Sequence, residues 1–266
     1  MFLSKAVKYI CLTGEIKKLN LLAAFEYRLN FFLQILIGGI VDFAFFLLWM
    51  LFFDSFTSVK GWTFQDTALH LSIAWLGWSL VDIIAGGSHK IAKRINLGYI
   101  DYYLLLPQNV LWNISVNRME TSSIGTFFVS FVMFSYSGNI TAAKCALFIG
   151  MSILSALILY NFIVIVQSIA FYIGNFELPA HEILLALVNL FYFPFSVFSG
   201  LLKYITMSII PAYFICTAPA FLVESFNWQL FGSVIIFWFI SFIMAIKLFY
   251  SGLKLYESAN LVQVNV

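Results

Sequence analysis

Long apolar runs separated by short polar connections recur along almost the whole chain, and few folds can accommodate them. A helix needs roughly 20 mostly apolar residues to cross a bilayer, where hydrocarbon cannot satisfy the backbone polar groups. Of the 266 residues 62% are hydrophobic and only 10% are charged, whereas about 25% of a soluble domain is charged. The sequence therefore predicts an all-α, polytopic membrane protein that forms a single domain over residues 1–266. Six runs predict transmembrane helices, at residues 29–53, 67–87, 112–136, 142–173, 181 to about 193, and 228–249.

Residues 195–227, between the fifth and sixth runs, are apolar but interrupted by glycine and proline. Proline lacks a backbone donor and clashes with the preceding turn, so Pro194 predicts a kink or an end of the fifth helix. Gly200, Pro211 and Pro219 argue against one straight helix. They predict an outer segment of short re-entrant or interfacial helices.

The lysines and arginines predict the orientation, because short loops rich in these residues stay in the cytoplasm. Placing both termini inside puts ten of them on the cytoplasmic side: Lys5, Lys8, Lys17, Lys18, Arg28, Lys90, Lys93, Arg94, Lys247 and Lys254. Three face outward: Lys60, Lys144 and Lys203. We therefore expect a multi-pass protein of the inner (plasma) membrane with cytoplasmic termini. Residues 5–28 mix apolar and charged residues at helical spacing, which predicts an amphipathic elbow helix on the membrane surface.

A basic segment between the second and third runs, residues 88–107, is the candidate contact for a cytoplasmic partner. Its basic cluster and adjoining apolar stripe are Lys90, Lys93, Arg94, Ile91, Ile95 and Leu97. Gly98 is suited to end this helix and Asp101 to cap the next turn. Because the segment joins two membrane helices directly, it is a candidate coupling helix. The alternative is an ordinary basic cytoplasmic loop.

Four ionisable residues lie within the predicted membrane helices: Asp42, Asp82, Arg118 and Glu120. Such residues are costly in lipid and usually face the bundle interior or water. The last three lie near cytoplasmic helix ends, where snorkelling or mutual pairing explains them. Asp42 lies deeper, and pairing with another helix, lining of a path and a position at a dimer interface all remain open.

Several classes of site have no support in the sequence. His70, His89 and His181 lie at different depths without further ligands at metal-binding spacing, so we predict no metal. We find no nucleophile paired with a base, and no pair of carboxylates placed for catalysis. The Gly-x-x-x-x-Gly-Lys-Ser/Thr phosphate loop is missing as well, so no ATPase site is predicted on this chain. The net charge of +2 gives no nucleic-acid signal.

The basic segment also carries a spaced motif, Gly98, Asp101, Leu104 and Pro107. It resembles the intracellular coupling region of ABC-2 type permeases, whose pattern in the subgroup of about this length is Gly-x-x-Asp-x-x-Leu-x-x-Pro. The stretch Phe-Glu-Tyr-Arg-Leu-Asn-Phe at residues 25–31 is similar to the same subgroup.

The prolines of the outer segment extend this resemblance over nearly the whole chain, through Phe193-Pro194, Pro211 and Pro219. One departure is Ser199-Gly200, where the family pattern leads us to expect another proline.

The resemblance implies a dimeric export permease, made of two copies or of this chain and a related one, in contact with membrane lipid. Each half is expected to dock onto a cytoplasmic ABC ATPase, which carries ATP and Mg²⁺; this chain has no cofactor of its own. The expected ATPase-coupling residues are Lys90, Lys93, Arg94, Gly98, Asp101 and Pro107. Glu26 and Arg28 are expected to brace the elbow helix against the first span, and the outer segment to help close the extracellular end.

Other classes of function remain as alternatives. One is an intramembrane enzyme or membrane-anchored assembly factor without an ATPase partner, which would need catalytic side chains gathered at one depth. A secondary transporter is another, and the chain lacks the repeated halves with matching broken helices that such proteins show. The transported substrate does not follow from the sequence.

Overall fold

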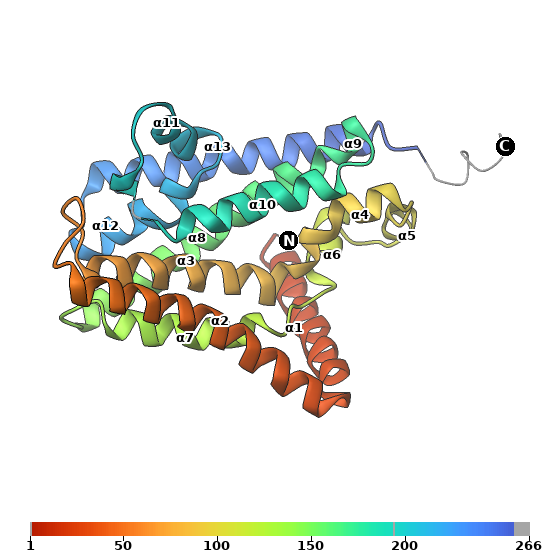
Figure 1. The fold of residues 1–266 in the computed structure, drawn as a ribbon. Coiled ribbons are helices and arrows are strands. Elements are labelled where there is room, and N and C mark those ends of the chain that lie inside the picture. The colour runs from red at the N-terminus through yellow and green to blue at the C-terminus, as the bar shows by residue number, and fades with distance from the viewer. Residues whose placement is uncertain (1, 194, 258–266) are drawn as a thin grey trace.

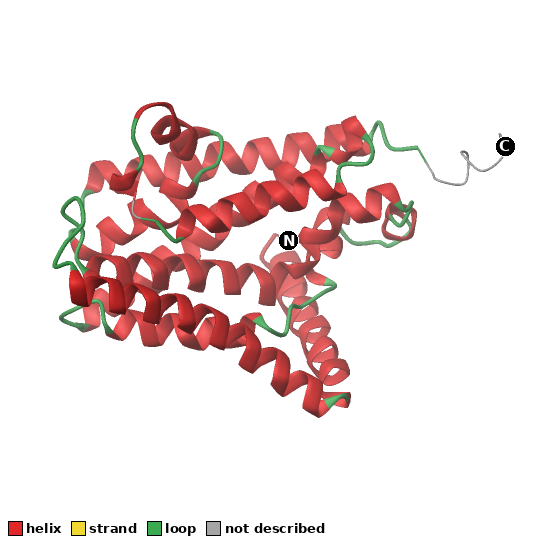
Figure 2. Ribbon diagram, in the orientation of Figure 1, coloured by secondary structure: helices red, strands yellow, loops and turns green. Residues whose placement is uncertain are grey.

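The computed structural model describes residues 2–193 and 195–257, and they form helices joined by short loops, with no strand among them (Figures 1 and 2). The all-α prediction is therefore confirmed. Most of the helices run side by side in one bundle, and the chain passes back and forth between its two ends (Figure 1). The helix α1 (Phe2–Glu26) leaves this bundle obliquely.

Four helical stretches are long and apolar enough to cross a membrane. They are α2 (Arg28–Ser55); α3 (Phe64–Ala85), continued by η1 (Gly86–Lys90) and α4 (Ile91–Asn96); α8 (Ala142–Ser168), continued by α9 (Ala170–Ile173); and α13 (Trp228–Leu253). The stretches that begin with α3 and α8 are mostly buried inside the protein, whereas few residues of α2 and α13 are buried and both helices expose many apolar side chains. Exposed apolar helices are stable in lipid and not in water, so the chain is a multi-pass membrane protein.

The third predicted helix, at residues 112–136, is divided in the structure. It consists of α6 (Val110–Val116) and α7 (Ser123–Ser135), with an irregular connection at residues 117–122. A break frees backbone carbonyls that need new partners. Lys17 of α1 supplies two hydrogen bonds, from its Nζ to the carbonyl oxygens of Val116 at 2.7 Å and Arg118 at 2.8 Å. One uninterrupted helix over this range was a wrong prediction.

The fifth run forms α10 (Glu177–Phe191), which is too short to appear among the four long stretches. After it come η2 (Phe195–Val197), α11 (Gly200–Ser208), the π-helical turn η3 (Tyr213–Thr217) and α12 (Ala218–Glu224). This succession of short helices is the one that the glycine and prolines predicted. Pro219 lies in the first turn of α12, where a missing N–H costs nothing, and Pro211 is buried just before η3. Pro194 lies outside the described residues.

The backbone at Gly200 accounts for the absence of a proline at this position, where the sequence departs from the family pattern. Its φ is +58°, in the left-handed region that glycine adopts readily. The ring of a proline fixes φ near about −65°. A proline at position 200 is therefore incompatible with this start of α11.

Small residues let the helices approach closely, as is common in membrane proteins. On α2, a Cβ atom added at Gly38 would lie 2.4 Å from the carbonyl oxygen of Ser122, beside α7. On α7, one added at Gly125 would lie 2.1 Å from the carbonyl oxygen of Ile35. The same crossing buries Asp42, whose Oδ2 accepts a 2.6 Å hydrogen bond from Thr126. Asp42 thus pairs with a neighbouring helix of its own chain.

The N-terminal helix α1 contacts the bundle near its middle, and the chain turns at its end into α2. Tyr27 separates α1 from α2. Glu26 and Arg28 flank this turn and are exposed, and the Arg28 guanidinium lies 5.6 Å from the ring centroid of Phe25. Arg28 therefore contacts α1 from the start of α2.

Candidate functional site

The segment of residues 86–107 lies at one end of the bundle and contains η1, α4 and α5 (Ile100–Leu104). Gly98 ends α4 with φ of +74°. Its N–H donates to the carbonyl oxygen of Ile95 and the next N–H, of Tyr99, donates to that of Arg94, at 3.2 and 2.9 Å. This is the Schellman arrangement of a helix C-terminus. The prediction that Gly98 ends a short helix is confirmed.

The apolar side chains of this segment divide between the core and the surface. Ile91 and Ile100 are fully buried, and Ile95 packs against the core beside them. Leu97, which the sequence pattern places in the same stripe, is instead 49% exposed. Further exposed side chains follow it: Tyr99, Tyr102, Leu104 and Leu105, of which Leu105 is 85% exposed. The segment thus holds to the bundle by one face and presents an apolar tip on the other.

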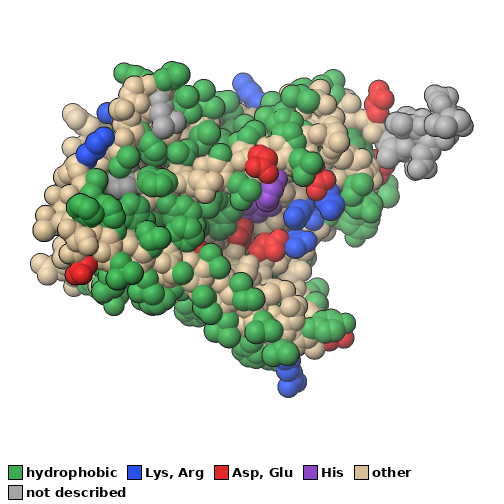
Figure 3. Space-filling view, in the orientation of Figure 1, with side chains coloured by type: hydrophobic (Ala, Val, Ile, Leu, Met, Phe, Trp, Pro, Cys, Tyr) green, Lys and Arg blue, Asp and Glu red, His purple; other side chains and the backbone are tan. Residues whose placement is uncertain are grey.

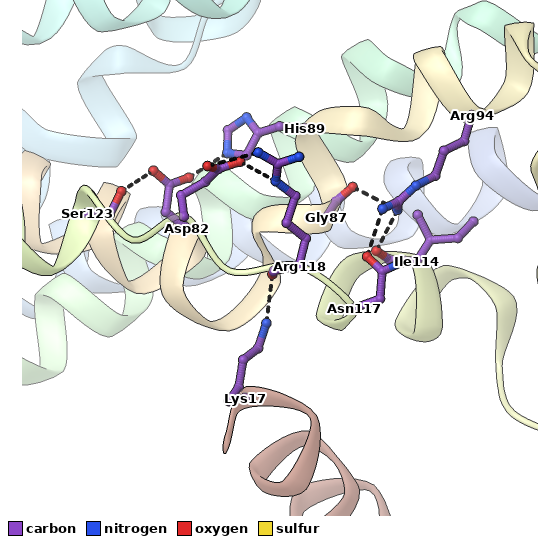
Figure 4. Close-up of polar contacts among 10 residues, drawn as sticks. Lys17, Asp82, Gly87, His89, Arg94, Ile114, Asn117, Arg118 and Ser123 are labelled. Carbon is purple, nitrogen blue, oxygen red and sulfur yellow. Dashed lines mark hydrogen bonds and ion pairs between the residues drawn. The ribbon is translucent and has the colours of Figure 1, made fainter. Parts of the chain in front are cut away.

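Arg94 ties the segment to α6. Its guanidinium donates to the carbonyl oxygens of Gly87 at 3.3 Å and Ile114 at 2.9 Å, and to Oδ1 of Asn117 at 2.8 Å (Figure 4). It also lies 5.3 Å from the ring centroid of Tyr103, to which Asn117 donates a further hydrogen bond. The planar fork of an arginine suits this arrangement, and a lysine ammonium does not.

Gly87 permits the close approach that these hydrogen bonds need. A Cβ atom at this position would lie 2.0 Å from the carbonyl oxygen of Ile114 and 2.8 Å from that of Ser115. Backbone atoms cannot move aside as a flexible side chain can. Glycine is therefore required where η1 crosses α6.

Asp82 forms a second polar connection at the end of α3. Its Oδ1 lies 2.8 Å from Nε2 of His89, and its Oδ2 accepts a 2.6 Å hydrogen bond from Ser123 of α7 (Figure 4). Its backbone carbonyl accepts from the N–H of Glu120 at 3.2 Å. Asp82 is only 6% exposed, so it links α3, η1 and the start of α7 from inside the protein.

Arg118 and Glu120 form an ion pair in the break between α6 and α7. Nε of Arg118 lies 2.8 Å from Oε1 of Glu120, and their side chains are 50% and 30% exposed. The pair is thus open to solvent, unlike Asp82. Glu120 also lines a polar cavity of about 200 Å³ with Asp82, His89, Lys90 and His181.

Other charged side chains gather near this cavity. Lys93 of α4 is exposed and lies 3.8 Å from the carboxylate of Glu177 at the start of α10. In Figure 3 the histidine, acidic and basic side chains form one group on a largely apolar face. Charged side chains are stable in water and costly in hydrocarbon. This end of the bundle is therefore suited to lie outside the hydrocarbon of the membrane.

Asp101 and Pro107 lie on either side of the apolar tip. Asp101 is in the first turn of α5, where Tyr99 is the N-cap residue, so Asp101 does not hold the cap position that we expected. Its carboxylate interacts with Tyr256 of the C-terminal segment, and burial together with that negative charge raises the pKa of Tyr256 to about 12. The Tyr256 ring lies 6.2 Å from that of Phe171 in α9. Pro107 is exposed in the bend before α6.

The N-terminal helix α1 reaches this end of the bundle through Tyr9 and Lys17. The Tyr9 ring packs edge-on against Trp112 at 4.7 Å, and its hydroxyl accepts from the N–H of Asn109 at 3.3 Å. Lys17 makes the two hydrogen bonds to the α6–α7 break already described, and burial lowers the pKa of Lys17 to about 8. No local sequence pattern indicates this lysine's role, because the break whose carbonyl groups it contacts is not itself predicted.

The structure thus brings together Asp82, Lys90, Lys93, Arg94, Arg118 and Glu120 at one end of the bundle. It leaves Asp42 inside the α2–α7 crossing, and Gly200, Pro211 and Pro219 in the outer segment. The described residues hold no group of three or more His, Cys, Asp or Glu side chains that could bind a metal.

Comparison with known proteins agrees with the resemblance noted in the sequence. The family described as "ABC-2 family transporter protein" matches residues 40–260. No curated protein and no solved structure matches the chain with significance. The matched range includes α3, the 86–107 segment, the α6–α7 break and the outer segment, and it spans well over half of the chain. The chain therefore belongs to the ABC-2 family of transporter proteins and is a membrane component of an ABC transport system.

Proposed function

We propose that this chain is the permease half of an exporter, and that its 86–107 segment receives the motion of a separate cytoplasmic ABC ATPase. The observation that carries this proposal is the exposed apolar tip at residues 97–105, at the end of the bundle where the basic side chains gather. Leu105 is 85% exposed and Tyr102 is 62% exposed. Contiguous apolar surface that faces water is typical of a protein contact site.

The segment is built to transmit a displacement. Arg94 and Gly87 lock α4 and η1 onto α6, while Asp82 locks η1 onto α3 and α7. A push on the tip is therefore passed to two membrane helices at once instead of being absorbed by a flexible loop. In this proposal Arg94 acts by holding the segment in shape.

The remaining expected residues then have distinct roles. Lys90 and Lys93 supply positive charge beside the tip, and Gly98 sets the angle between α4 and α5. Asp101 links the tip to the C-terminal segment, and Pro107 directs the chain into α6. ATP and Mg²⁺ belong to the partner. When the ATPases close on ATP, the segment moves and the two membrane halves rearrange to release substrate outward.

We infer that the chain lies in the inner (plasma) membrane and crosses it six times. Both termini are then in the cytoplasm. The α6–α7 pair and α10 supply the two crossings beyond the four long stretches, because they run alongside those stretches in the bundle (Figure 1). In this topology α1 is an elbow helix, which Glu26 and Arg28 brace against α2. The outer segment, with Gly200, Pro211 and Pro219, helps to close the extracellular end.

A second permease chain completes the path in this proposal, either a second copy or a related chain. The support is the long apolar face of α2, which is largely uncovered within one chain. Lipid covers whatever part of this face the second chain does not.

Purification with the ABC ATPases encoded in the same genome tests the proposal. We expect one of them to bind and its ATP hydrolysis to change on association. Leu105→Glu should abolish binding by placing a charge in the apolar contact. Leu201→Glu is the matched control, since Leu201 is 75% exposed on α11, and it should bind normally. Equal binding by the two variants, or binding of no ATPase, contradicts the proposal.

A further inference from the structure

A separate apolar groove of about 620 Å³ lies beside α6, and it shares no lining residue with the cavity that Asp82 and Glu120 line. Its walls come from α3, α6, α8 and α13, and Thr13 of α1 lies at its edge. Two of its few polar groups satisfy each other, because the hydroxyl groups of Ser115 and Tyr160 are 2.9 Å apart. Binding sites for small molecules have volumes of about 300–1,000 Å³. The groove is thus large enough for a ligand, and its lining requires an apolar one.

The groove spans about two thirds of the hydrocarbon depth of one leaflet of the bilayer. On α3 it begins at Leu80 and ends at Ala85, directly before η1. On α8 it extends from Ile153 to Tyr160, a rise of about 10 Å. Half of the hydrocarbon thickness is about 15 Å. The groove therefore occupies the leaflet on the side of the 86–107 segment.

One wall of the groove opens sideways. Ile153 is 48% exposed, and Leu157 and Phe242 are each 42% exposed. Because these apolar side chains belong to membrane-crossing helices, they face lipid. A ligand can thus enter from the bilayer without passing through water.

The end of the groove nearest the 86–107 segment carries polar and aromatic groups from α1. Tyr9 packs on Trp112, and such side chains prefer the headgroup level of a membrane. Lys17 donates two hydrogen bonds to the carbonyl oxygens of Val116 and Arg118 (Figure 4). An ammonium group has three N–H donors, so one is left for a phosphate oxygen. Lys17 is thus a cation at headgroup depth, close to Val116 in the groove wall.

We propose that this groove binds one acyl chain of an anionic phospholipid from the cytoplasmic leaflet, with the headgroup phosphate beside Lys17. The bound lipid joins α1 to α3, α6, α8 and α13, and so fixes the elbow helix to the bundle. The proposal depends on the membrane location of the chain and is independent of export and of an ATPase partner.

Native mass spectrometry of the full-length protein in mild detergent tests the proposal, with phosphatidylglycerol and phosphatidylethanolamine added in equal amounts. Wild type should retain one phospholipid, with phosphatidylglycerol favoured several-fold. Ile153→Trp should fill the groove and lose this lipid. Ile149→Trp should retain it, because Ile149 is also 48% exposed on α8, one turn away, but does not line the groove. Leu157→Trp, from the same open wall, provides a second filling variant.

Lys17→Met tests the headgroup contact separately. It should still retain a lipid but lose the preference for phosphatidylglycerol, whereas Lys18→Met, at a 68% exposed side chain, should keep it. The acyl-chain site is overturned if Ile149→Trp loses the lipid to the same extent as both filling variants. It is also overturned if the wild-type protein retains no lipid. An unchanged preference in Lys17→Met overturns the headgroup contact.

Discussion

The guanidinium of Arg94 donates a 2.9 Å hydrogen bond to the backbone carbonyl oxygen of Ile114, which lies 20 residues further along the chain. This contact closes the 86–107 segment into a loop that is anchored at both ends. A basic residue that the sequence suggested for surface contact thus lies largely within the fold. The rigidity of the segment, on which the proposed coupling depends, rests on such contacts.

Arg94→Lys should destabilise the protein, because an ammonium cannot reach the three acceptors that the planar fork of arginine reaches. Hydrogen bonds to charged groups contribute about 1.5–3 kcal/mol each, and we expect a loss of about 2 kcal/mol in unfolding free energy. Lys93→Arg at an exposed position is the control and should change little. Thermal unfolding in detergent measures both. Equal midpoints for the two variants contradict the bracing role.

Gly87→Ala should also destabilise the protein, since its Cβ would lie 2.0 Å from the carbonyl oxygen of Ile114. Overpacking of this kind costs about 1–3 kcal/mol. Gly150→Ala in α8 is the matched control, because a Cβ there has no atom within 4 Å. In thermal unfolding in detergent, we expect a lower midpoint for Gly87→Ala than for wild type, and a wild-type midpoint for Gly150→Ala. We also expect Gly87→Ala to be less monodisperse than wild type. A wild-type midpoint for this variant shows that η1 and α6 do not approach so closely.

Asp82→Asn should cost more stability than Glu120→Gln, although both substitutions remove one negative charge. The Asp82 carboxylate is buried between His89 and Ser123, and loss of one buried partner costs about 1–3 kcal/mol. Glu120 is paired with Arg118 in an exposed position, and such pairs contribute about 0–1 kcal/mol. Chemical unfolding in detergent compares them, and the reverse order contradicts the described burial.

The stability of the elbow contact should depend on pH through Lys17. Burial lowers its pKa from 10.5 to about 8 in the folded protein, so between these values the unfolded chain binds more protons. Folding stability therefore gains from this group as the pH rises from about 8 to 10.5. The unfolding midpoint of wild type should rise relative to that of Lys17→Met between pH 8 and pH 10. A constant difference contradicts a buried, charged Lys17.

The sequence predicted most of the fold, because its main signals are local. Apolar length identified α2, α3, α8 and α13, and the outer prolines indicated the short helices after α10. The division at residues 117–122 was missed, since mean hydropathy hardly registers a few polar residues between two apolar stretches. That break is stabilised by Lys17, about 100 residues earlier in the chain, and no local pattern contains this information.

For the 86–107 segment, the sequence predicted the end of its first helix but not the directions of its side chains. Glycine at position 98 is a recognisable helix end, and its φ agrees. The direction in which Arg94 and Leu97 point was not predictable, because a short helix between two turns has no single buried face. The partners of Asp82 come from η1 and α7, so only the three-dimensional structure brings them together.

The most direct test of the account is photo-crosslinking in cells, with a photoreactive amino acid placed at Tyr102 or at Tyr204. These tyrosines are 62% and 70% exposed and belong to α5 and α11, which lie at the two ends of the bundle (Figure 1). The account predicts an adduct with an ABC ATPase from position 102 and none from position 204. Absence of such an adduct at position 102, or its presence only at position 204, would contradict the central claim that the 86–107 segment is the docking site for a cytoplasmic ATPase.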